Sequence, residues 1–184
     1  MTSIWVESLD RSFEAALDVL AAALRDCPPE LWQSSMWEVP SDLFGLAPLG
    51  PQGKPITNPG ARHALAQRRS TPWSVAWHAL ECLDYDLTGE FAPWAPSPPF
   101  TDKPHWQMTT LTAAWTPSDL LRYVEYCRQR VRDTLAAMTD EKAATPLPAA
   151  HRYSGRPHAW IITEAVGHTI EHASQIRQFI TDAG

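Results

Sequence analysis

Three histidines have the residue type and spacing of a metal site. His168 and His172 stand four residues apart in an apolar-periodic stretch, and His78 lies in a second such stretch 90 residues before His168. Side chains at positions i and i+4 share one face of a helix, with Cβ atoms roughly 5–6 Å apart, so two imidazoles can reach one ion. A third imidazole from a packed neighbouring helix would complete an open three-histidine site. We therefore take His78, His168 and His172 as the candidate metal ligands.

An ion held in this way would act as a Lewis acid. Three neutral imidazoles leave its double positive charge uncompensated, and a tetrahedral ion with three protein ligands keeps one position open. Water bound there falls in pKa from near 15.7 towards ~7, and a bound thiol is deprotonated outright. Either becomes a nucleophile at neutral pH. Imidazole suits several ions, so zinc is the first expectation, with nickel, iron and manganese as alternatives.

The sequence predicts four long helices to position these side chains. Apolar residues recur at intervals of three and four, as on the buried face of an amphipathic helix. Thr71 and Thr116 are each followed by proline, a pattern typical of an N-cap and the first helical position. His168 and His172 fall on the apolar stripe of the last helix and are expected to face the core. The predicted helices span 4–25, 71–89, 116–138 and about 157 through 179.

No segment shows the two-residue alternation of a strand or the dipeptides of a hairpin turn. The expected fold class is therefore all-α, a four-helix bundle with a long crossover connection between helices 1 and 2. The 184 residues suffice for one core, so 1–184 is expected to form a single domain. The crossover, 28–70, is rich in proline, and only 29–32 within it is expected to be helical. A second connection, 91–115, carries tryptophans that could wall an apolar pocket or plug the end of the bundle: Trp94, Trp106 and Trp115.

Composition excludes several classes of partner. The formal charge is −6, with acidic and basic residues interspersed, so nucleic acid would find no electrostatic footprint. The chain has no basic, apolar leader and no run of 18 apolar residues, which indicates a cytoplasmic protein that does not bind membranes.

Its three cysteines are odd in number and lack a Cys-x-x-Cys pair, which argues against disulfides and thiolate zinc knuckles. Cys82 and Cys127 lie in helical patterns and are expected to be small buried thiols.

Two short segments carry a resemblance to a known family. They are Trp73-Ser-Val-Ala-Trp-His78-Ala-Leu-Glu81 in the second predicted helix and Gly167-His-Thr-Ile-Glu-His172-Ala-Ser-Gln-Ile176 in the last. With the order of elements, they resemble the DinB-like (YfiT-like) superfamily of metal-dependent enzymes. The resemblance implies a four-helix bundle whose metal is held by one histidine of the second helix and an H-x-x-x-H pair of the last. His78, His168 and His172 match that pattern, whereas the long connections do not.

The resemblance also implies a function. Relatives in the superfamily use a low-molecular-weight thiol, such as bacillithiol or mycothiol, so the leading expectation is a thiol-dependent S-transferase that detoxifies small electrophiles, as a homodimer. Arg152, Tyr153 and Arg156 could reach the carboxylates of an acidic thiol if their loop folds over the site. A hydrolase that uses metal-bound water and a non-catalytic, stress-associated metal-binding protein are the alternatives.

The same histidine pair also spells H-x-x-E-H, the inverzincin protease motif. That reading needs a glutamate ligand downstream, and no glutamate follows His172. Glu171 and Glu164 are instead candidate hydrogen-bond acceptors for an imidazole N–H, or solvated carboxylates. The remaining histidines are expected to be exposed or to cap helices: His63, His105, His151 and His158.

Overall fold

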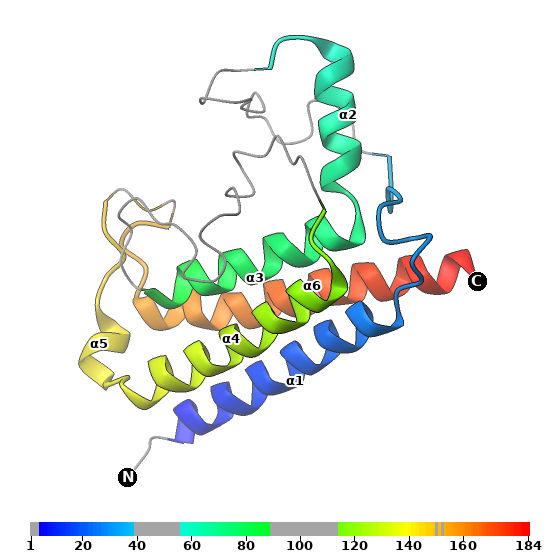
Figure 1. Ribbon diagram of the computed structural model, residues 1–184. Helices are drawn as coiled ribbons and strands as arrows, with labels where there is room; N and C mark the ends of the chain where they lie inside the picture. Colours follow the sequence, from blue (N-terminus) through cyan, green and yellow to red (C-terminus); the bar gives the residue numbers. More distant parts are fainter. Residues whose placement is uncertain (1–3, 39–55, 89–113, 150, 152) are drawn as a thin grey trace.

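The structure is a computed structural model that describes residues 4–38, 56–88, 114–149, 151 and 153–184. Six helices and no named strand occur within these residues, which confirms the all-α class (Figure 1). Among the described residues, none of the helices has the length and hydropathy of a membrane span. The helices are α1 (Ile4–Asp26), α2 (Pro59–Arg69), α3 (Pro72–Thr88), α4 (Pro117–Ala136), α5 (Asp140–Ala144) and α6 (His158–Ala183).

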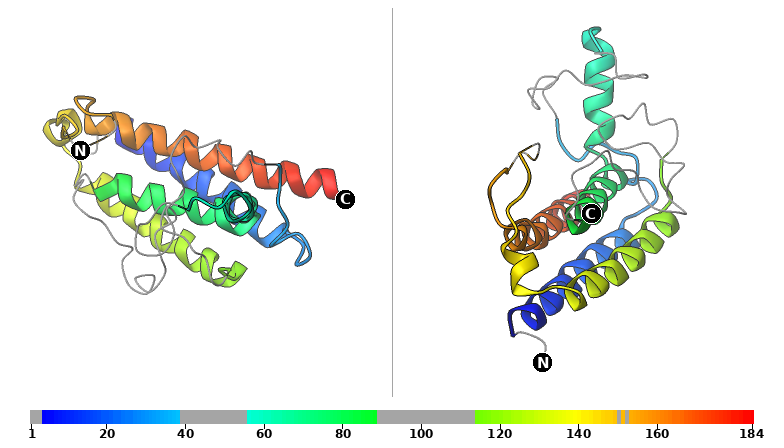
Figure 2. Two further views of the ribbon diagram at one scale, coloured as in Figure 1. Left: turned by 90° about the horizontal axis from the view of Figure 1, so that it is seen from above. Right: turned by 90° about the vertical axis from the view of Figure 1, so that its left-hand side faces the viewer.

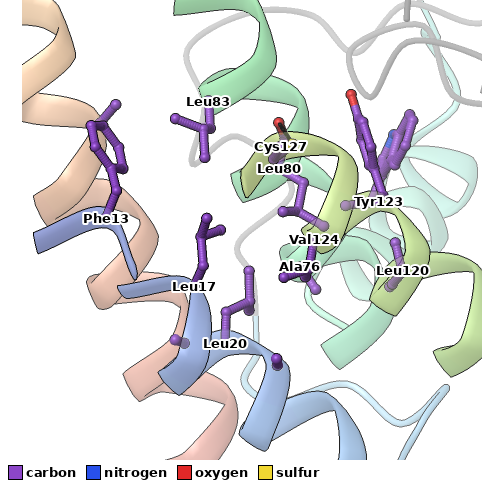
Figure 3. Close-up of a cluster of buried hydrophobic side chains, with 14 of the residues drawn as sticks. Phe13, Leu17, Leu20, Ala76, Leu80, Leu83, Leu120, Tyr123, Val124 and Cys127 are labelled. Carbon is purple, nitrogen blue, oxygen red and sulfur yellow. Dashed lines mark hydrogen bonds between the residues drawn. The ribbon is translucent and has the colours of Figure 1, made fainter. Parts of the chain in front are cut away.

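The four long helices, α1, α3, α4 and α6, share one core. Helix α1 packs against α4 and α6, and α3 packs against the same two helices. Figure 3 shows Leu17 and Leu20 of α1 pointing toward labelled side chains of α3 and α4, with Phe13 nearer the ribbon of α6; all three are fully buried. Burial of one such side chain is worth about 1.5–3 kcal/mol, so this shared core holds the long helices in place.

The start of α4 is set by a capping box. The backbone N–H of Asp119 donates to the Thr116 hydroxyl (3.1 Å), and the Thr116 N–H donates to the Asp119 carboxylate (3.2 Å). The predicted role of Thr116 is therefore confirmed. The start of α3 differs, because the Thr71 hydroxyl donates to the carbonyl of Arg68 at the end of α2 (2.8 Å).

Helix α2 corrects the expectation of an irregular connection over 28–70. Asn58 caps it by accepting from the N–H of Ala61 (3.0 Å), and Pro59 occupies its first position. The helix stands away from the four long helices and meets them at the start of α3 (Figures 1 and 2). The segment predicted to be helical around 29–32 instead forms hydrogen-bonded turns, such as the bond from the N–H of Leu31 to the carbonyl of Pro28 (3.0 Å). Residues 39–55 of the predicted crossover lie outside the described residues.

The segment between α5 and α6 fixes where α6 begins; we call its described residues, 145–149, 151 and 153–158, the clasp. The N–H of Leu147 donates to the carbonyl of Arg156 (2.7 Å), and the N–H of His158 donates to the carbonyl of Thr145 (2.8 Å). Gly155 reverses the chain with a φ of 81°, in the left-handed region that favours glycine. The clasp therefore ties the first residue of α6 to the residue that follows α5.

Candidate metal centre

The three predicted ligands come together where α3 and α6 pack side by side in opposite directions (Figure 1). The ring centroid of His78 lies 5.1 Å from that of His168 and 5.1 Å from that of His172. The two rings of α6 are 4.4 Å apart. All three side chains are half-buried, so the histidines line the edge of the core rather than its centre. The expectation that His168 and His172 face the core is therefore only partly right, and the half-burial leaves them accessible to a ligand.

The two histidines of α6 point ring nitrogens at one another. Nε2 of His172 lies 3.0 Å from Nε2 of His168. Two nitrogens bound to one tetrahedral ion at 2.0–2.1 Å would lie about 3.3 Å apart. The observed separation is therefore close to what a shared ion requires, and a small change of side-chain torsion would supply the rest.

Gln175 determines which ring nitrogen of His172 carries the hydrogen. The side-chain oxygen Oε1 of Gln175 lies 2.8 Å from Nδ1 of His172, and Nε2 of Gln175 donates to Glu171 (3.3 Å). Because an amide oxygen only accepts, Nδ1 of His172 carries the hydrogen and Nε2 keeps its lone pair. Burial lowers the pKa of His172, against the opposing effects of Gln175 and Glu171. The ring is thus a neutral imidazole, the form that binds metals.

Cys82 belongs to the same cluster, which sequence reasoning missed. Its Sγ lies 3.6 Å from Nδ1 of His78, and the ligating atoms of His78, Cys82 and His168 all lie within 4.8 Å of one another. Cys127 is the buried thiol that was expected, bonded to the carbonyl of Leu80 (3.7 Å). Cys82 is not, because it is half-buried beside two histidines. Its position four residues after His78 repeats the spacing of the α6 pair and was the available signal.

A pocket of about 400 Å³ opens beside the cluster. Cys82 and His168 form part of its wall, so the pocket reaches the candidate metal centre directly. Three carboxylates also line it: Asp86, Glu164 and Glu171. Of the two predicted acceptors, Glu171 reaches His172 through Gln175, and Glu164 contributes to the pocket wall.

Arg152, Tyr153 and Arg156 were expected to reach the carboxylates of an acidic thiol, and the structure supports this only for the position of Tyr153. Tyr153 lines the pocket, but the guanidinium of Arg156 lies over the ring of Trp160, 5.4 Å from its centroid. Arg152 and most of the connection over 91–115 lie outside the described residues. Trp115, at the end of that connection, is buried, and its carbonyl accepts from the indole N–H of Trp32 (2.8 Å).

The hydrogen bonds of the other described histidines are to residues outside the cluster of His78, Cys82, His168 and His172. His63 is exposed on α2, as expected. His158 lies at the start of α6 with Nε2 3.4 Å from the carbonyl of Asp86. His151 is buried, not exposed, and its Nδ1 accepts from the N–H of Tyr153 (3.1 Å), so it orders the clasp. His105 lies outside the described residues.

Comparison of the chain with models of protein families, with curated proteins and with solved structures found no match. The resemblance to the DinB-like superfamily therefore stays a prediction that depends on the residues quoted for it. The geometry of the cluster carries the functional argument.

Proposed function

We propose that this protein is a metal-dependent enzyme whose divalent ion is held by His78, His168 and His172. The observation that carries the proposal is the convergence of the three rings, with centroids 4.4–5.1 Å apart, from two helices distant in sequence. Without an ion, Nε2 of His168 and Nε2 of His172 are within hydrogen-bond distance of each other (3.0 Å). Around an ion, each would supply a lone pair.

The donor set fits a divalent transition ion. Imidazole nitrogens suit zinc, nickel, iron and similar ions, and zinc is our first choice. When bound, such an ion supplies a positive charge that lowers the pKa of a coordinated water or thiol into the neutral range. The pocket of about 400 Å³ beside His168 is where a small substrate would meet that group.

The chain's own residues orient the site. Gln175 holds the hydrogen of His172 on Nδ1, so the Nε2 lone pair faces His168. Glu171 in turn fixes the Gln175 amide by accepting from its Nε2. Such supporting residues keep a ligand in one orientation and commonly contribute roughly 10- to 100-fold to metal affinity.

We propose thiol-dependent S-transfer to small electrophiles as the reaction, and the resemblance to the DinB-like superfamily supports this choice. A low-molecular-weight thiol would lose its proton to solvent or to a pocket carboxylate such as Glu164 or Asp86. Its sulfur would then form a bond to the electrophilic carbon while the leaving group departs with the electron pair. The finer fold, a DinB-like bundle with a crossover before α3 that assembles as a homodimer, belongs to the same proposal.

A hydrolase is the second candidate, because the carboxylates that line the pocket can serve it as well. Asp86, Glu164 and Glu171 line the same pocket as His168, and carboxylates can accept the proton of an attacking water. The two reactions differ in one requirement, since hydrolysis proceeds without any added thiol. A non-catalytic metal-binding protein would show neither reaction.

Metal analysis tests the site. We expect about one equivalent of transition metal in the purified wild type and little in His168→Ala, whereas His63→Ala, which removes an exposed histidine of α2, should keep its metal. Equal metal content in wild type and His168→Ala would contradict the proposal.

Activity assays then distinguish the reactions. Conjugation of monochlorobimane should require both bound metal and an added thiol such as bacillithiol, mycothiol or N-acetylcysteine. Ester hydrolysis that is independent of thiol would identify the hydrolase. A metal-loaded protein inactive in both assays would indicate the non-catalytic alternative, in which His78→Ala costs stability alone.

A further inference from the structure

Two residues of α3 face two residues of α6 at the candidate metal centre, and one of the four is a cysteine. His78 and Cys82 are four residues apart on α3, as His168 and His172 are on α6. Helical spacing places each pair on one face. The sulfur of Cys82 therefore stands in the same relation to His78 as the two imidazoles of α6 stand to each other.

The distance between Cys82 and His78 matches that of two ligands on one ion. A nitrogen at 2.0–2.1 Å and a thiolate sulfur at 2.3 Å from a tetrahedral zinc ion would lie about 3.5 Å apart. Sγ of Cys82 lies 3.6 Å from Nδ1 of His78. His168 completes a group of three whose ligating atoms lie within 4.8 Å of one another. The sulfur thus lies in the same group of potential ligand atoms as His78 and His168.

We propose that Cys82 is a fourth protein ligand, bound as thiolate to the ion of the proposed function, on which this inference rests. On binding, the thiol loses its proton to solvent and the sulfur donates a lone pair to the ion. The thiolate brings one negative charge to a site otherwise made of neutral imidazoles. A nitrogen and sulfur donor set selects zinc or cobalt over magnesium and manganese, which prefer oxygen ligands.

The fourth ligand has a consequence for the substrate. Three imidazoles and a thiolate fill the four positions of a tetrahedral ion, so an incoming thiol or water must displace Cys82 or become a fifth ligand. Cys82 also lines the pocket beside the site. A substrate in that pocket therefore has direct access to the ligand that it would displace.

Cobalt(II) spectroscopy tests the sulfur ligand without any measurement of activity. We would titrate the metal-free protein with cobalt(II) chloride and record the near-ultraviolet band of thiolate-to-cobalt charge transfer, with the visible bands of tetrahedral cobalt. The wild type should show both. Cys82→Ser and Cys82→Ala should lose the near-ultraviolet band but still bind cobalt, at least about tenfold more weakly, as for lost supporting residues. Cys27→Ser is the matched control and should keep both features, because Cys27 lies next to the end of α1, bonded to the carbonyl of Pro28 (3.7 Å).

The outcomes separate this inference from the proposed function. Visible cobalt bands without the near-ultraviolet band in the wild type would overturn the role of Cys82 and leave the three-histidine site standing. Absence of all cobalt bands in a folded wild type would overturn both. A near-ultraviolet band that survives in Cys82→Ala would assign the sulfur to another residue and also refute the inference.

Discussion

Zinc should stabilise the folded protein, and the loss of His168 should abolish most of that effect. The candidate ligands belong to two helices, so a bound ion would link α3 to α6 in addition to their apolar contacts. An ion that binds the folded chain better than the unfolded chain raises the free energy of unfolding by mass action.

The expected magnitude follows from linkage and chain length. Free zinc at 100 times the dissociation constant adds about 2.7 kcal/mol. For a chain of 184 residues, a change of 1 kcal/mol moves Tm by roughly 2–4 °C, so the wild type should gain about 5–11 °C. If His168→Ala weakens binding about 100-fold, the same zinc concentration adds only about 0.4 kcal/mol, or roughly 1–2 °C.

The assay is thermal unfolding followed by circular dichroism, with and without zinc chloride, after treatment with a chelator. His63→Ala controls for the loss of any histidine, since His63 is exposed on α2. It should show the wild-type increase in Tm. The reasoning is refuted if zinc raises the Tm of His168→Ala by as much as that of the wild type.

Three further predictions concern the scaffold. Asp84→Ala should lower the free energy of unfolding by about 1–3 kcal/mol in urea denaturation, because it removes the acceptor of the buried Tyr123 hydroxyl (3.0 Å); no loss would contradict this. Thr116→Ala should cost about 1 kcal/mol in the same assay through loss of the capping box, and Thr116→Asn should restore most of it. Burial, with a smaller effect of Glu30, raises the pKa of Cys27 to about 11. Alkylation of Cys27, followed by peptide mass spectrometry, should therefore accelerate roughly tenfold per pH unit from pH 8 to 10, since only the thiolate reacts; a plateau near pH 9 would contradict the shifted pKa.

The sequence predicted the long helices well because their signals are local. The proline after Thr116 and the acid at Asp119 mark the start of α4, and the apolar period of α1 gave its end to within one residue. Helix α2 was missed although Asn58 and Pro59 provide its start signal. Only three of its residues are buried, so it shows no clear apolar stripe.

The candidate site could be predicted in part. Each pair within a helix follows from spacing alone, but the meeting of His78 with the α6 pair depends on how α3 and α6 pack. The sequence predicts Cys82 to be a small buried thiol, whereas its contact with His78 follows from its position as the i+4 neighbour on the same helix. The bond from His172 to Gln175 depends on side-chain torsions, which the residue types do not fix.

The clasp determines where along the axis of α6 the candidate metal ligands lie relative to α3. Helix α6 starts where the clasp holds His158, and His168 follows ten residues later, about 15 Å along the helix axis. One residue inserted between them would rotate the pair by about 100° and shift it by about 1.5 Å, which would carry both imidazoles away from α3. The clasp thus sets the register of His168 and His172 relative to α3. Insertions or deletions in α6 before His168 should therefore reduce metal binding far more than insertions or deletions after Gln175.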